Sequence, residues 1–164
     1  HTGSFFFSRP SIGSWISYGL GTLNSNLPSF VVLAAQLPYA GTQVYANDFL
    51  PAYHQGVRVT PGQEPIVDLE RRSKHARVQE LELGLTERLH QLQFSQRSDV
   101  PDLAARIRSF ETAFHMQTEA KDAFDIASET QATQDMYGIG QGDTDTFAWK
   151  CLVARRLAER GVRF

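Results

Sequence analysis

The clearest hydrophobic pattern in the chain lies between residues 77 and 96. Apolar side chains recur there every three or four residues, which places them on one face of an α-helix: Val78, Leu81, Leu85, Leu89 and Leu92. A second helix is predicted to begin around Ser98–Asp102, where capping residues and an early proline precede another stripe. That stripe consists of Leu103, Ile107, Phe110 and Phe114. The pattern therefore predicts a pair of amphipathic helices in the middle of the chain.

Two shorter helices are predicted after this pair. Ser128–Gln131 has the form of a capping box, and Gly138 follows at a distance expected for the end of a short helix. Asp145–Arg160 predicts the last helix, with a stripe of residues in register: Phe147, Cys151, Ala154 and Ala158. The apolar run Val162–Phe164 is typical of the opening of a β-strand.

The first third of the chain is rich in glycine, serine, proline and aromatic residues. Pro10–Gly21 predicts a short helix whose small residues allow close packing against a neighbour: Gly13, Ser14 and Ser17. Ser29–Ala34 is a continuous apolar run, typical of a strand buried on both faces of a parallel sheet. Leu37–Pro65 contains four prolines and no sustained period, which predicts a long irregular loop.

These elements predict the α/β class. A single strand cannot form a sheet, so we expect partner strands from outside residues 1–164. The loop-like start at His1 and the strand that opens at Val162 both suggest a segment of a longer protein. We expect one incomplete domain with four successive parts, namely a helix plus core strand, a loop region, a helical block and a strand opening: residues 1–36, 37–76, 77–160 and 161–164.

Composition narrows the classes of function. The chain of 164 residues is 41% hydrophobic and 21% charged, which is typical of a folded domain rather than a disordered segment. A formal net charge of −2 gives no electrostatic reason to expect nucleic acid as a partner. No apolar stretch approaches the roughly 20 residues that span a bilayer. The single cysteine, Cys151, excludes an internal disulfide and a multi-cysteine metal site.

The richest polar cluster is Asn47–Gly56. Asp48 and His54 form a candidate pair there, in which the carboxylate orients the imidazole as a base, or both contact a metal or an anionic substrate. The alternative is a surface loop in which Asn and Asp cap turns and the histidine packs locally. Arg9, directly before Pro10, is either an anion ligand near a helix N-terminus or a solvated side chain. These residues alone give no complete catalytic set.

Several segments, taken in order, resemble one family. They are His1–Ser4, Arg9–Trp15, Tyr18–Gly21, Asn26–Leu33, Leu37–Gly41, Asn47–Pro51, His54–Gly56, Met136–Gly138 and Cys151–Leu157. Together they resemble the bacterial domain-of-unknown-function family 1501, a sulfatase-like branch of the alkaline phosphatase superfamily. The resemblance covers nearly the whole chain, and it implies a fold with a central, mostly parallel sheet flanked by helices.

The resemblance also implies an activity. Relatives in that superfamily hydrolyse sulfate or phosphate esters with divalent metals (Ca, Zn, Mg or Mn) and a nucleophile at a helix N-terminus. Their nucleophile precedes a Thr-Gly pair similar to Thr2–Gly3, which places it upstream of His1, with the main metal ligands also outside this segment. The segment would pack against the remainder of its parent chain and line a pocket for an anionic ester through Asp48, His54 and Arg9. Many members are exported, which implies the periplasm or cell envelope.

Two other interpretations stay open. A protein with the same fold that has lost catalysis would act as a binding or scaffold protein. Alternatively, Arg77–Ile126 is chiefly an interaction module, and apolar stripes exposed on its helices would favour that interpretation.

Overall fold

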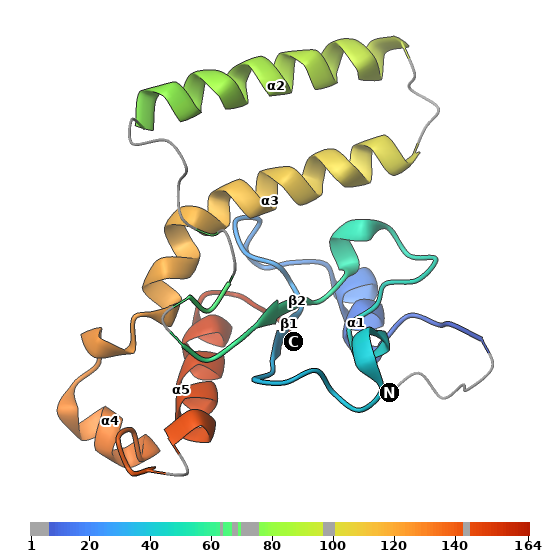
Figure 1. Ribbon diagram of the computed structural model, residues 1–164. Coiled ribbons are helices and arrows are strands. Elements are labelled where there is room, and N and C mark those ends of the chain that lie inside the picture. Colours follow the sequence, from blue (N-terminus) through green and yellow to red (C-terminus); the bar gives the residue numbers. More distant parts are fainter. Residues whose placement is uncertain (1–6, 63, 67–68, 70–75, 97–100, 143–144) are drawn as a thin grey trace.

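The computed structural model describes residues 7–62, 64–66, 69, 76–96, 101–142 and 145–164 (Figure 1). The helices are α1 (Ile12–Leu20), α2 (Ala76–Gln96), α3 (Pro101–Phe124), α4 (Gln131–Tyr137) and α5 (Asp145–Glu159). The strands are β1 (Val31–Leu33) and β2 (Val57–Val59), and the 3-10 helices are η1 (Gly41–Val44), η2 (Ala52–His54) and η3 (Ile126–Ser128). The architecture is helix-rich and mixed α/β, which confirms the predicted class.

The sheet is built from strands that are neighbours within the chain. β1 and β2 pair in parallel, with Val31 opposite Val57. The prediction of an irregular loop over Leu37–Pro65 is wrong, because this stretch contains β2 as well as η1 and η2. Its prolines lie outside Val57–Val59, so they do not remove a hydrogen bond from the strand. The expectation that β1 must find its partner strand outside the chain is therefore also wrong.

The last residues of the chain lie along the other edge of β1. The amide of Phe164 donates to the carbonyl of Ser29 at 3.2 Å, and the amide of Val31 donates to the carbonyl of Phe164 at 2.8 Å. This is the bonding pattern of neighbouring parallel strands. β1 itself is half-buried rather than buried on both faces as predicted.

The hydrophobic core lies where α3, α5 and the sheet meet. Its buried members are Leu27, Met116, Ala120, Ala123, Val153, Leu157 and Val162. α5 does not bury the predicted stripe: Phe147 is 69% exposed, and the helix buries Ala148, Leu152, Val153, Arg156 and Leu157 instead. The sequence offers apolar residues on more than one side of this helix, and packing against α3 decides which side is covered.

α1 packs as closely as its small residues predict. Ser11 caps the helix, and its hydroxyl accepts a hydrogen bond from the amide of Ser14 at 3.3 Å. A Cβ atom added to Gly13 would lie 2.5 Å from the ring of the buried Phe30. Glycine is therefore required where α1 crosses the start of the sheet.

The shorter helix α4 begins later than predicted. Its N-cap is Thr130, whose hydroxyl accepts from the amide of Thr133, rather than Ser128. Ser128 ends η3 and donates its hydroxyl to the carbonyl of Asp125, so it is engaged in the preceding turn. Gly138 ends α4 in the left-handed conformation, with φ at 78°, as the sequence predicts.

The predicted pair of long helices is confirmed as α2 and α3. In Figure 1, α3 runs past the body of the protein and α2 lies alongside it on the outer side. The apolar stripe of α2 is largely exposed, with Leu81 at 67%, Leu85 at 61% and Leu89 at 51%. The stripe therefore does not serve as a core-facing surface within the described part of the chain.

Candidate functional site

A cleft of about 920 Å³, lined by both polar and apolar side chains, opens between α1, η2 and α3. α1 contributes Ser17 and Tyr18 to its lining, and η2 contributes Tyr53 and His54. α3 forms the opposite wall through Arg108, Ser109, Glu111, Thr112, His115 and Met116. Because α3 is far from α1 and η2 in the sequence, only the folded chain creates this site.

His54 is the end member of a hydrogen-bonded chain that continues through two serine hydroxyls. It is only 6% exposed, and its Nδ1 atom lies 2.7 Å from the hydroxyl of Ser17. The Ser17 hydroxyl is in turn hydrogen-bonded to the hydroxyl of Ser29, which also lines the cleft. The rings of Tyr18 and Tyr53 lie 5.4 and 4.1 Å from the imidazole, centroid to centroid. The imidazole thus contacts two aromatic rings and is hydrogen-bonded through one nitrogen.

Two effects keep this imidazole neutral. Burial lowers the pKa of His54 below its usual value of 6.5, and the positive charge of Arg108 lowers this pKa further. A neutral imidazole can accept a proton or donate a hydrogen bond at neutral pH. His54 therefore suits the work of a base or a polar ligand better than that of a cation.

Arg108 supplies a positive charge at the mouth of the cleft. Its guanidinium carbon lies 5.2 Å from the ring centroid of Tyr53, and the side chain is exposed. Within the described part of the chain Arg108 forms no ion pair, although Glu111 lines the same cleft. The guanidinium is thus oriented by an aromatic ring while its N–H groups stay available to a ligand.

One of the three residues predicted to line a pocket lies in this cleft, namely His54. Asp48 is exposed, adopts a φ of 50° and does not line the cleft. Among the described residues Ser17, not Asp48, bonds to the His54 imidazole. Arg9 is exposed and also lies outside the cleft lining.

Local sequence patterns carry only weak signals for the other residues of the cleft. Ser17 was recognisable as a small residue for close packing, but its bond to His54 joins positions 37 residues apart. Arg108 follows Ile107 of the apolar stripe directly, a position that local periodicity assigns to solvent. No local pattern could indicate that this exposed side chain meets Tyr53.

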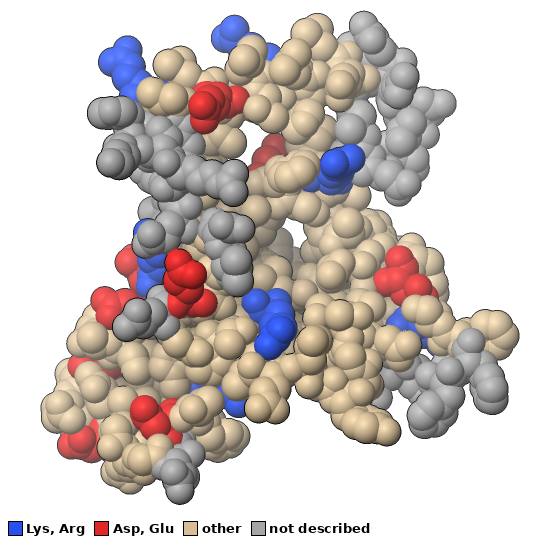
Figure 2. All heavy atoms as spheres, viewed as in Figure 1, with Lys and Arg blue, Asp and Glu red and all other residues tan. Residues whose placement is uncertain are grey.

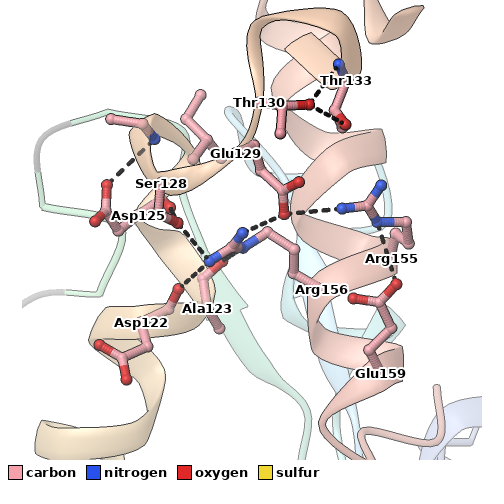
Figure 3. Close-up of polar contacts among 12 residues, drawn as sticks. Asp122, Ala123, Asp125, Ser128, Glu129, Thr130, Thr133, Arg155, Arg156 and Glu159 are labelled. Atoms are coloured by element: carbon pink, nitrogen blue, oxygen red, sulfur yellow. Dashed lines mark hydrogen bonds and ion pairs between the residues drawn. The ribbon is translucent and has the colours of Figure 1, made fainter.

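A second polar cluster, around Arg156, has a structural role (Figure 3). Arg156 is 7% exposed, and it donates to the carbonyls of Asp122 and Ala123 at 2.6 and 3.1 Å. It also forms an ion pair with Glu129, which Arg155 contacts as well. These carbonyls belong to the last turn of α3 and have no partner within the helix, so Arg156 caps α3 from α5.

Neither the surface charge nor the arrangement of possible metal ligands among the described residues indicates a particular class of ligand. On the face in Figure 2, Lys and Arg alternate with Asp and Glu, without a continuous patch of either sign. The described residues contain no group of three or more His, Cys, Asp or Glu side chains that could hold a metal ion. In the same residues, no helix combines the length and apolar character needed to cross a membrane.

The fold and the site define a mixed α/β protein with a short parallel sheet and a cleft walled by a long helix. The chain belongs to the family described as protein of unknown function (DUF1501), whose model matches residues 1–164. No curated protein and no solved structure matches this chain.

Proposed function

We propose that this chain is part of a sulfatase-like protein that hydrolyses sulfate or phosphate esters, and that it forms one wall of the cleft for the anionic ester. The observation that carries the proposal is the convergence of a guanidinium, a neutral imidazole and several hydroxyls on one cleft. The resemblance of the chain to a sulfatase-like branch of the alkaline phosphatase superfamily also supports it.

One side chain of the cleft, Arg108, suits an oxyanion, and the same lining also carries the carboxylate of Glu111. Sulfate and phosphate groups present several acceptor oxygens, which a planar guanidinium matches with paired N–H donors. Arg108 has these donors available and is held over Tyr53. The hydroxyl of Thr112, about one turn further along α3, lines the same wall and can donate a hydrogen bond, whereas the Ser109 hydroxyl donates to the carbonyl of Ala105 at 3.0 Å.

His54 serves this ester as a neutral polar group. Its Nδ1 is engaged by Ser17, which leaves Nε2 as the nitrogen for a ligand or a proton. In hydrolysis of an ester, such a group can donate a hydrogen bond to the leaving oxygen or accept a proton from water. We assign His54 to the positioning of the ester group.

Divalent metals and the nucleophile belong, in this proposal, to other parts of the parent chain. The resemblance places the nucleophile upstream of His1, so we expect residues 1–164 alone to bind an anionic ester without turning it over. The parent would work in the periplasm or cell envelope, where related family members are exported.

The test is a titration of the purified chain with inorganic sulfate, inorganic phosphate and p-nitrophenyl sulfate, followed by calorimetry and thermal unfolding. A ligand that binds only the folded state raises the unfolding temperature. We expect binding that is lost in Arg108→Gln. Arg106→Gln is the matched control, because Arg106 lies on the same helix, stacks on Phe110 and is absent from the cleft lining.

The outcomes separate the possibilities. Binding that Arg108→Gln and Arg106→Gln weaken equally would reflect general surface charge and contradict the proposed site. Ester turnover by the chain of 164 residues would contradict the placement of the nucleophile upstream of His1. Binding by the longer protein without any turnover, with metals supplied, would instead favour a non-catalytic binding protein of the same fold.

A further inference from the structure

The outer face of α2 is an apolar surface without a covering element in the described part of the chain. Val78, Leu81, Leu85 and Leu89 are 45%, 67%, 61% and 51% exposed. Residues on the opposite side of the helix, such as Leu83 and His90, are half-buried. Because α3 is the helix that lies alongside α2 (Figure 1), the half-buried side faces α3 and the leucine stripe faces away from the body.

The spacing of this stripe suits another helix rather than a flat surface. Its members follow one another at intervals of three, four and four residues on a helix of 21 residues. Such intervals keep the stripe nearly straight along the helix, as in the seam of a helix pair. A single helical partner can therefore cover the stripe over most of the length of α2.

The charges beside the stripe identify that partner. At about 100° per residue, and with Leu85 at the centre, Arg77 and Arg88 lie roughly 60–80° to one side of the stripe. Glu82 lies roughly 60° to the other side. One flank of the stripe is therefore basic and the other is acidic. A surface of this kind is complementary to a second copy of itself, provided that the two helices run in the same direction.

The relative direction of the two α2 helices follows from the two-fold symmetry of the pair. In a two-fold parallel pair, the basic flank of one helix meets the acidic flank of the other, so Arg77 approaches Glu82 of the second copy. These residues are five apart, which is the offset at which parallel coiled coils form ion pairs across the seam. In a two-fold antiparallel pair each flank meets the same flank of the other copy, so the basic flank faces the basic flank and Arg77 cannot approach Glu82. We propose that α2 is a dimerisation helix that pairs in parallel with α2 of a second copy of this chain.

The seam is short, so the association should be weak and should depend on concentration. Sedimentation analysis of the purified chain over rising concentrations should show a monomer–dimer equilibrium. Leu85→Glu places a charge in the seam and should abolish the dimer. Gln91→Glu adds the same charge to α2 away from the stripe and should leave the dimer intact. Far-UV circular dichroism verifies that both variants stay helical.

Charge reversal tests the same surface without changing a leucine. Glu82→Arg should weaken the dimer, because both flanks of the stripe become basic. Adding Arg77→Glu to Glu82→Arg on the same chain should restore it, because the two flanks are again complementary. A double variant that dimerises no better than Glu82→Arg would overturn the assignment of the flanks.

A disulfide test reports the direction of the pair. In a Cys151→Ser background, Val78→Cys should form a cross-linked dimer on mild oxidation, since parallel helices bring the two copies of residue 78 together. Glu87→Cys, on the other side of the helix, should not. A wild-type chain that stays monomeric at high concentration, a dimer that Leu85→Glu leaves unchanged, or a dimer without the residue 78 cross-link would each overturn the proposal.

Discussion

Replacing Arg156 with leucine tests the capping of α3 by α5. The side chain is 7% exposed and is the shared partner of two carbonyls in the last turn of α3 and of Glu129 (Figure 3). Leucine keeps much of the aliphatic packing and removes every one of these bonds. The carbonyls of Asp122 and Ala123 would then be left without this donor at a site largely shielded from water.

The expected loss follows from the bonds removed. Hydrogen bonds from a charged donor contribute about 1.5–3 kcal/mol each, so the two carbonyl bonds alone amount to about 3 kcal/mol at the lower end. Removal of one member of a buried ion pair costs about 3–5 kcal/mol in general. Glu129 keeps its bond to Arg155, so its charge is not left unpaired and the lower figure applies. We therefore expect Arg156→Leu to lower the free energy of unfolding by about 3 kcal/mol.

Arg155→Leu is the matched control. Arg155 is the neighbouring residue and also contacts Glu129, but its side chain is 31% exposed and it makes no bond to the carbonyls of α3. Ion pairs that water reaches contribute little. Thermal unfolding followed by circular dichroism compares the two variants, and a loss of about 3 kcal/mol corresponds to a fall of about 6–12 °C in midpoint temperature for a chain of this size. Equal midpoints for the two variants would refute the capping role of Arg156.

Three further predictions concern the close approach of α1, the cleft and α4. Gly13→Ala should destabilise the protein by about 1–3 kcal/mol, because the new methyl group meets the ring of Phe30. Gly19→Ala is the control and should not destabilise it, because there is open space around Gly19. Urea unfolding compares the two variants. The lowered pKa of His54 means that the unfolded state binds a proton first, so stability should fall as pH drops below 6.5. His54→Gln should flatten that part of the stability profile, and an unchanged profile would contradict the burial of the imidazole. Gly138→Ala should cost about 1 kcal/mol in thermal unfolding, because φ there is 78°; no loss would mean that α4 ends differently in solution.

The sequence determined the helices of this protein. The stripe of α2, the cap and glycines of α1, and Gly138 at the end of α4 are local signals, because a helix forms its hydrogen bonds between residues four apart. The strand β1 was also predictable from its apolar run, whereas its partner strand β2 was not. These features depend on residues that are close in the chain, so the chain itself specifies them.

Tertiary structure decided the rest. β2 is a strand of three residues inside a proline-rich stretch, and it forms because it pairs with β1. Gly56, directly before β2, lies so close to the ring of Phe30 that a Cβ atom there would be 2.7 Å from it. The buried face of α5 was set by packing against α3, not by its own apolar spacing. The cleft joins Ser17, His54 and Arg108, which lie on three elements far apart in sequence. Contacts of this kind depend on how elements pack, and no local pattern of residues encodes them.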